Sequence, residues 1–288
     1  MRVSAAAGAD SDDVWADFGT KLVYFVRTAA VLDMSWTADG SLLSAHHDGT
    51  VSIFTASGAD CGDCSTSVVF QGVPCLYLHT SCVGGGERVI CGGVGGRAAV
   101  LECTGAGRPL HSKLTWMLPE PHPDVWCCAN YTDSTVLTGD DCGALCLWDL
   151  RCIQDAAVNH PSHLHTRTHR ASITDISFSN HNPHIFATGS HDNHCRIFDV
   201  RKLANPILEV MFPSSVWRAV WHPLSPSFLL LACMEDGAHI LNVDTAAIFH
   251  MLRPSNDLLY ACDWFRGAPI TASFYTSYVH CWPRFSLC

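Results

Sequence analysis

Apolar and polar residues alternate along several short stretches of this chain. Residues 144–150 read ALCLWDL and residues 194–200 read HCRIFDV, and both favour apolar side chains at alternate positions. A period of two residues is typical of a β-strand whose two faces meet different surroundings. No long window has the period of an amphipathic helix, so the pattern predicts an all-β fold built from many short strands.

These strands belong to a longer unit that recurs along the chain. Residues 187–201, ATGSHDNHCRIFDVR, contain an apolar run, a Gly/Asp turn and an alternating strand, and residues 136–151, VLTGDDCGALCLWDLR, repeat this plan. Further copies occupy residues 42–56 and 229–243, with weaker ones at 88–102 and 269–283. The units end at Thr55, Glu102, Asp149, Asp199, Asn242 and Pro283. A period of roughly 40–45 residues with a Trp-Asp ending is that of a WD repeat, which forms one four-stranded blade of a β-propeller.

The repeats predict how the whole chain is organised. We expect a WD-repeat β-propeller with six recognisable blades, and the sequence leaves room for a seventh, degenerate one. Residues 1–17 are expected to form a flexible acidic N-terminus, and residues 18–288 a single β-propeller domain. The last blade lacks an outer strand, which Lys21–Arg27 is expected to supply, because closing the ring removes exposed sheet edges.

The composition narrows the choice of partners and compartment. No apolar run reaches the roughly 20 residues needed to span a bilayer, and the acidic N-terminus does not resemble a signal peptide. The chain has 17 basic and 27 acidic residues, a net charge of −10, which argues against a nucleic acid as partner. Without an export signal, the 16 cysteines indicate reduced thiols. We therefore expect a cytoplasmic monomer with no nucleic-acid or membrane partner.

Two clusters of metal-binding residue types are open to two interpretations. The sequence CGDC at residues 61–64 offers a single C-x-x-C pair, whereas zinc needs four ligands. Residues 159–169 carry His160, His163, His165 and His169, a density that suits a transition metal. Because they lie in the longest interval between repeats, a solvated loop is favoured. We expect no metal and no cofactor, and a metal-dependent hydrolase stays a third hypothesis.

The polar residues of the turns between strands have a structural interpretation. An Asp at such a bend accepts hydrogen bonds from its own backbone and holds the turn. The residues placed at this position by the repeats are Asp48, Asp141, Asp192 and Asp236. We therefore expect Asp192 to hold its turn, while its neighbour His191 is less constrained.

The first strands of the blades bring aromatic residues into register. The segments VLDMSW, SITDISF, VWRAVW and LLYACDW align on their last residue, and Trp217 and Tyr260 precede that residue by four positions. Trp126, in DVWCCAN, is equivalent. In a propeller these positions begin the innermost strands and surround one mouth of the channel. Aromatic rings there, on an acidic protein, are suited to a quaternary ammonium group; the alternative is ordinary packing between blades.

The C-terminal third of the chain resembles a known family. Residues 216–242 (VWRAVWHPLSPSFLLLACMEDGAHILN), 258–264 (LLYACDW) and 271–282 (TASFYTSYVHCW) are similar to blades of the diphthine methyl-esterase family of WD-repeat proteins. The resemblance implies hydrolysis of the methyl ester of methylated diphthine, on the modified histidine of translation elongation factor two, in diphthamide biosynthesis. That substrate bears a trimethylammonium group, which Trp217, Tyr260 and Trp126 would hold.

Ester hydrolysis needs a nucleophile or an activated water and a group that stabilises the oxyanion. Arg218 is expected to supply that positive charge or to orient the new carboxylate. His191 and Asp140, at turns of the same mouth, are the expected water-activating pair. Ser273 is a candidate nucleophile, although no base is marked by its spacing. The competing hypothesis is a non-catalytic scaffold, in which the aromatic residues bind a partner peptide.

Overall fold

The computed structural model describes residues 2–5, 29–55, 64–83, 86–103, 110–165, 168–250, 257–276 and 278–282. Within these residues the chain forms 25 strands and no helix, which confirms the all-β prediction. None of the described segments is therefore a helix long and apolar enough to cross a membrane.

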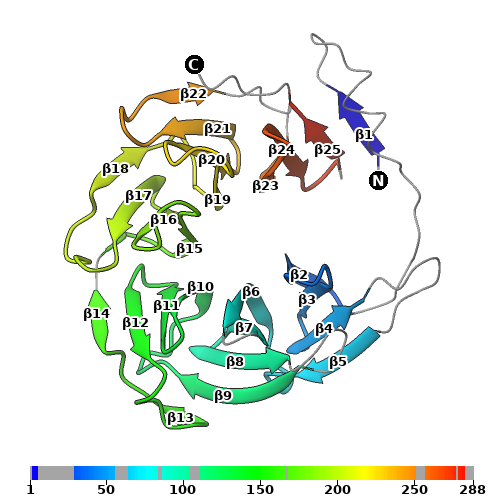
Figure 1. Ribbon diagram of the computed structural model, residues 1–288, viewed down its shortest axis with the longest axis vertical. Helices are drawn as coiled ribbons and strands as arrows, with labels where there is room; N and C mark the ends of the chain where they lie inside the picture. The colour runs from blue at the N-terminus through cyan, green and yellow to red at the C-terminus, as the bar shows by residue number, and fades with distance from the viewer. Residues whose placement is uncertain are drawn as a thin grey trace. The chain divides into compact units, whose positions relative to one another are not determined.

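The strands pair into six sheets, and each sheet is built around one repeat (Figure 1). The three sheets that come first along the chain contain β2 (Val31–Trp36), β3 (Leu42–His46), β4 (Thr50–Phe54) and β5 (Cys64–Val68); β6 (Cys75–Val83), β7 (Gly86–Gly93), β8 (Arg97–Cys103), β9 (His111–Met117) and β13 (Ala157–Val158); and β10 (Val125–Thr132), β11 (Thr135–Asp140), β12 (Leu145–Asp149) and β14 (His163–His165).

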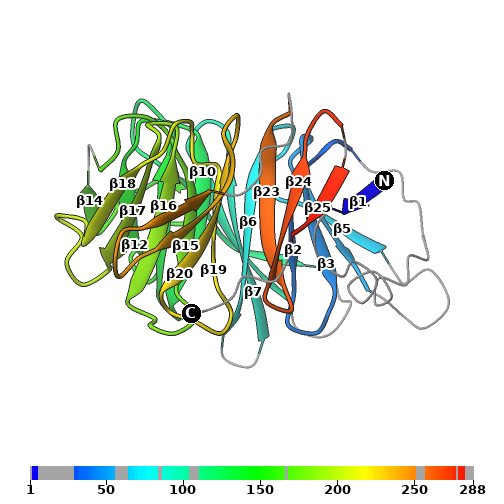
Figure 2. The same cartoon turned by 90° about the horizontal axis from the view of Figure 1, so that it is seen from above.

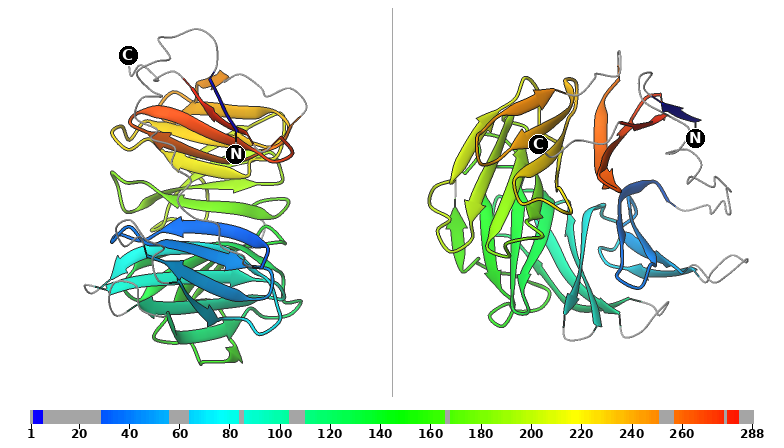
Figure 3. Two further views of the ribbon diagram at one scale, coloured as in Figure 1. Left: turned by 90° about the vertical axis from the view of Figure 1, so that its right-hand side faces the viewer. Right: turned by 45° about the horizontal axis from the view of Figure 1, so that its top comes forward.

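The other three sheets contain β15 (Ile173–Phe178), β16 (Ile185–Ser190), β17 (His194–Asp199) and β18 (Leu208–Met211); β19 (Arg218–Trp221), β20 (Phe228–Cys233), β21 (Gly237–Asn242) and β22 (Ile248–His250); and β23 (Leu259–Phe265), β24 (Ala268–Ser273), β25 (Tyr278–Cys281) and β1 (Arg2–Ala5). Figure 3 shows β20, β21 and β22 side by side, in yellow to orange. The fold class, a WD-repeat β-propeller with six blades, is confirmed, and the described residues form no seventh sheet.

The contacts divide the chain into two compact units. Unit 1 comprises Met1–Leu22 and Ser177–Cys288, and unit 2 comprises Val23–Ile176. Each unit has its own apolar core: Phe212, Trp221 and Leu231 belong to that of unit 1, and Leu43 and Phe70 to that of unit 2. The single domain over residues 18–288 therefore stays a prediction.

The outer strand of the last blade comes from an unexpected segment. β1, within the segment expected to be flexible, pairs in parallel with β25, and its Arg2 is in register with Tyr278 (Figure 2). The segment predicted for this place, Lys21–Arg27, lies outside the described residues, as do residues 6–17.

Two of the six repeats carry a buried tryptophan at or just after the end of their third strand. At the end of β12, Trp148 donates its indole N–H to Thr138 Oγ1 on β11, at 2.9 Å, and Trp282 donates to Thr271 Oγ1 at 3.0 Å. Both indoles are buried, and a buried Trp normally needs such a partner. These hydrogen bonds tie the second and third strands of a blade together.

Candidate functional site

The aromatic residues aligned in the sequence lie at irregular points of their strands. The pairing of β10 with β11 shifts register between Val125 and Cys127, and that of β23 with β24 shifts between Leu259 and Ala261. The residues inside these two β-bulges are Trp126 and Tyr260. A bulge re-aims a side chain and is frequent next to functional sites. The prediction that these residues begin the first strands of their blades is confirmed.

An aromatic row crosses three blades of unit 1. The ring centroids of His191 and Trp217 are 5.4 Å apart, those of Trp217 and Tyr260 are 4.9 Å apart, and those of Tyr260 and Phe274 are 5.2 Å apart. Tyr275 continues the row at 5.0 Å from Phe274. The first three residues are half-buried, whereas Phe274 is 60 % and Tyr275 70 % exposed. The row is therefore open to solvent at one end and packed at the other.

One carboxylate acts on the aromatic row at Tyr260. Burial raises the pKa of Tyr260, and the neighbouring Tyr275 and Glu235 raise it further. Glu235 is exposed. Aromatic rings with a carboxylate near one of them are a favourable environment for an organic cation, since both the charge and the ring quadrupoles attract it.

Two of the predicted catalytic residues, His191 and Arg218, adjoin Trp217 of the aromatic row. His191 contacts Trp217 through its ring, and Arg218 follows Trp217 directly as the first residue of β19, where it is half-buried and in register with Ala232. Their roles in a reaction stay predictions.

Trp126 and Asp140 belong to unit 2, so their membership of the same site also stays a prediction. Asp140 is 3 % exposed, and its Oδ1 accepts backbone hydrogen bonds from Cys142 and Ala144, both at 2.9 Å. Burial raises the pKa of Asp140, against the effect of these hydrogen bonds. Asp140 therefore stabilises its own turn through these backbone hydrogen bonds.

The carboxylate that holds this turn lies one residue earlier than the repeats predicted. Asp141, expected to hold the turn, instead accepts hydrogen bonds at Oδ1 from the indole of Trp126, at 3.1 Å, and from the hydroxyl of Ser172, at 2.6 Å. The equivalent prediction for Asp192 is confirmed, because its Oδ1 accepts the backbone N–H of His194 at 3.1 Å. Asp141 is thus the carboxylate that orients Trp126, a function that sequence reasoning missed.

A serine and a histidine form a pair that the sequence did not reveal. Ser273 Oγ lies 2.8 Å from His280 Nε2. Ser273 ends β24 opposite Leu259, and the next residue along β23 from Leu259 is Tyr260. The pair therefore adjoins the aromatic row. Burial lowers the pKa of His280, and the Asp257 carboxylate opposes this shift.

The turn that follows Ser273 is held by one carboxylate. Burial alone would raise the pKa of Asp257, but hydrogen bonds from the Thr276 hydroxyl and from the amides of Tyr275, Thr276 and Leu258 lower it to about 2. The amide of Tyr275 donates to Oδ1 at 2.8 Å, and that of Thr276 donates to Oδ2 at 3.0 Å. Asp257 thus fixes the position of Phe274 and Tyr275 at the open end of the row.

The described residues of the two clusters weighed as metal sites do not form a metal-binding group. Among the described residues, no group of three or more His, Cys, Asp or Glu side chains could hold a metal ion. His160 and His163 are exposed, whereas His169 is 1 % exposed. Cys61 and the side chain of His165 lie outside the described residues.

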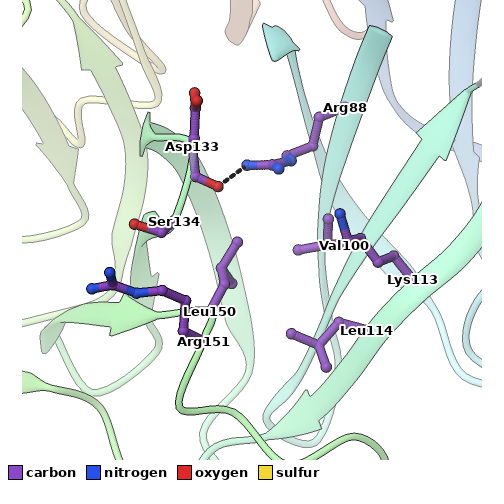
Figure 4. A pocket seen from close by; sticks show the side chains of 8 residues that line it. All are labelled: Arg88, Val100, Lys113, Leu114, Asp133, Ser134, Leu150 and Arg151. Carbon is purple, nitrogen blue, oxygen red and sulfur yellow. Dashed lines mark hydrogen bonds between the residues drawn. The ribbon is translucent and has the colours of Figure 1, made fainter. Parts of the chain in front are cut away.

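A cavity of about 260 Å³ lies elsewhere in unit 2, between β7–β9 and the turns that flank β11 and β12 (Figure 4). It is lined by three cations, and all three face carboxylates: Arg88 and Lys113 lie 3.6 and 2.5 Å from Glu102, and Arg151 lies 2.6 Å from Asp149. Arg88 also donates to the carbonyl of Asp133 at 2.7 Å. Because its charges are compensated and none of the predicted site residues lines it, this cavity is not the candidate site.

Comparisons with known proteins agree with the fold and the resemblance. The family described as WD domain, G-beta repeat matches residues 21–55, 112–149 and 161–199. The mouse protein named diphthine methyltransferase is 28 % identical over 265 residues, which cover 82 % of this chain and 53 % of the mouse protein. The human protein of the same name is 33 % identical over 152 residues, 49 % of this chain and 32 % of the human protein.

The chain thus spans about half the length of the mouse relative and a third of the human one. A chain in the crystal structure of the Mitotic Checkpoint Complex superposes with a TM-score of 0.69 and 14 % identity, over 90 % of this chain and 80 % of the other. At that identity the likeness concerns the fold alone.

Proposed function

Because this chain is a WD-repeat protein homologous to the proteins named diphthine methyltransferase, we propose that it acts in diphthamide biosynthesis as a carboxylic ester hydrolase. Its substrate is methylated diphthine on the modified histidine of translation elongation factor two, in the cytoplasm. The products are the free carboxylate and methanol.

The observation that carries this proposal is the aromatic row. Trp217 and Tyr260 meet edge to face at an interplanar angle of 84°, and Glu235 lies beside Tyr260. The substrate implied by the resemblance carries a trimethylammonium group close to its ester. Such a group is bound by aromatic faces at roughly 0.5–2 kcal/mol for each good contact, and a carboxylate adds Coulombic attraction.

The roles of the charged residues follow from the chemistry of an ester. The carbonyl oxygen gains negative charge in the transition state, and the guanidinium of Arg218, next to Trp217, would stabilise it. His191 contacts Trp217, and its proposed role is to activate a water. An imidazole can remove a proton at neutral pH.

Methyl transfer is the second candidate function, because the names of the mouse and human relatives state it. The two reactions move a methyl group in opposite directions. A methyltransferase would add a methyl group at the expense of a donor, whereas the proposed hydrolase removes one with water.

The direction of the mass change separates the candidates. Elongation factor two carrying methylated diphthine and, separately, the same protein carrying the free carboxylate are each incubated with the purified protein, with and without S-adenosylmethionine, and the intact mass is followed. The proposal predicts a loss of one methylene unit that does not require the donor. A gain that requires the donor would establish methyl transfer. An unchanged mass, with the protein folded and the substrate verified, would favour the scaffold.

A further inference from the structure

We propose that Ser273 is the nucleophile of this esterase and that His280 is its general base. The inference rests on the proposed function for the identity of its substrate, and on the hairpin formed by β24 and β25 for its geometry. It replaces the activated water, expected at His191, with a covalent route.

The hairpin brings the two side chains together. β24 and β25 are antiparallel neighbours (Figure 2), with Thr271 in register with His280 and Ala272 in register with Val279. Ser273 is the next residue along β24, and its Oγ lies 2.8 Å from His280 Nε2. A nucleophile and base at this separation can exchange a proton directly. With the ring protonated on Nδ1, the Ser273 hydroxyl donates to Nε2.

The surroundings of the pair fit a reaction at the aromatic row. Ser273 is 7 % exposed, so bulk water has little access to its hydroxyl, whereas Phe274 and Tyr275, directly after it, are open to solvent. Tyr260, one residue beyond the cross-strand neighbour of Ser273, contacts Phe274. A trimethylammonium group held by these rings would bring the ester of the same substrate residue towards Ser273.

A second Ser–His hydrogen bond in the first blade shows what a purely structural pair looks like. Ser44 Oγ lies 2.9 Å from His46 Nε2, which also lies 3.1 Å from Ser52 Oγ. The three residues are 3 %, 1 % and 2 % exposed. His46 Nε2 is shared between two hydroxyls inside a closed core, whereas the Ser273 pair adjoins an exposed aromatic turn. Ser44 is therefore a matched control for Ser273.

The electrostatics keep the base ready at neutral pH. Burial lowers the pKa of His280, so the neutral imidazole that accepts a proton predominates. The Asp257 carboxylate acts in the opposite sense and stabilises the imidazolium that forms during attack. Tyr275, in the turn of this hairpin, and Glu235 both act on the neighbouring Tyr260.

The reaction balances as a two-step acyl transfer. Ser273 Oγ attacks the ester carbonyl carbon while His280 Nε2 accepts the hydroxyl proton. The tetrahedral intermediate collapses, the bond between carbon and methoxy oxygen breaks, and His280 returns the proton so that methanol leaves. Water then attacks the acyl-Ser273 ester, again with His280 accepting a proton. When this second intermediate collapses, its bond to Ser273 Oγ breaks and His280 returns the proton to that oxygen; the released acid then ionises to the carboxylate.

The test uses the full chain and two independent readouts. Wild type, Ser273→Ala, His280→Asn and the control Ser44→Ala are compared for methanol release from methylated elongation factor two and for covalent labelling by a fluorophosphonate, mapped by peptide mass. Folding is checked for each by circular dichroism and thermal melting. We expect label on Ser273 in wild type and Ser44→Ala, with turnover unchanged in the control. Turnover should fall by roughly 10²- to 10⁴-fold in His280→Asn and at least as far in Ser273→Ala.

Each outcome separates this inference from the proposed function. If folded Ser273→Ala keeps a turnover within about threefold of wild type, Ser273 is not the nucleophile, while the proposed esterase activity is unaffected. Label on Ser273 without any ester turnover would overturn the proposed substrate and support the pair. Wild type that is neither labelled nor active would overturn both. If Ser273→Ala does not fold, the turnover of His280→Asn and the identity of the labelled peptide test the assignment of Ser273 and His280 instead.

Discussion

Tyr260 shows how a single extra residue can shape a surface. It occupies the bulge between Leu259 and Ala261, and its ring contacts Trp217 on one side and Phe274 on the other. In a regular strand, neighbouring side chains alternate between the two faces of the sheet; a bulge breaks that alternation and redirects one of them. The aromatic row thus depends on an irregularity that local polarity does not reveal.

Removing one ring of the row should weaken recognition of the cation. In Trp217→Leu we expect KM for the methylated substrate to rise by about 2- to 30-fold, the equivalent of one cation–π contact, with a smaller change in kcat. Trp217→Phe keeps an aromatic face, so its KM should lie between the values for wild type and Trp217→Leu. Calorimetry with a peptide bearing a trimethylammonium group measures the same loss directly. Equal affinity for wild type and Trp217→Leu would contradict the assignment.

The pH profile should report the titration of His280. Its pKa in the folded protein is lowered below the ordinary histidine value of about 6.5. The neutral base therefore persists as the pH falls to 6.5, and kcat/KM should decline only below that pH. The decline should follow the protonation of one group. An acid limb centred above 6.5 would show that a different group controls the reaction.

At the scale of elements, turns were predicted well and individual turn residues less well. The Asp-Gly pairs marked the bends because a glycine there adopts positive φ: Gly49 has φ +82° and Gly237 has φ +90°. The adjacent Asp140 and Asp141 could not be told apart, since the pattern does not say which carboxylate folds back on the turn. The outer strand supplied by β1 was also missed, because four residues carry too little pattern to identify a strand.

The turn glycines allow a matched test of packing in an element. A Cβ on Gly49 would lie 1.7 Å from the carbonyl oxygen of Phe70, whereas a Cβ on Gly40, at the similar φ of +83°, would meet nothing within 4 Å. Gly40→Ala should cost about 1–2 kcal/mol of unfolding free energy from backbone strain alone. Gly49→Ala should cost clearly more, because the Phe70 backbone must move. Urea unfolding measures both; equal losses would contradict this close approach.

For the whole molecule, the repeat predicted more than any single motif. The period of the units and the aromatic or aliphatic residue near the end of each predicted six blades, because each unit must form one sheet around that buried apolar residue. The aromatic positions followed from aligning those units. The contact of His280 with Ser273 could not be predicted from that alignment, because it depends on the pairing of β24 with β25. A serine seven residues before a histidine is not a recognisable sequence motif.

The most direct test of the account is hydrolysis in water enriched in ¹⁸O. Elongation factor two carrying methylated diphthine is incubated with the purified chain in this solvent, and the modified peptide and the methanol are analysed by mass. The account predicts one ¹⁸O atom in the new carboxylate and unlabelled methanol, because cleavage occurs between the acyl carbon and the methoxy oxygen. A peptide that keeps its methyl ester, or gains a methyl group, would contradict it.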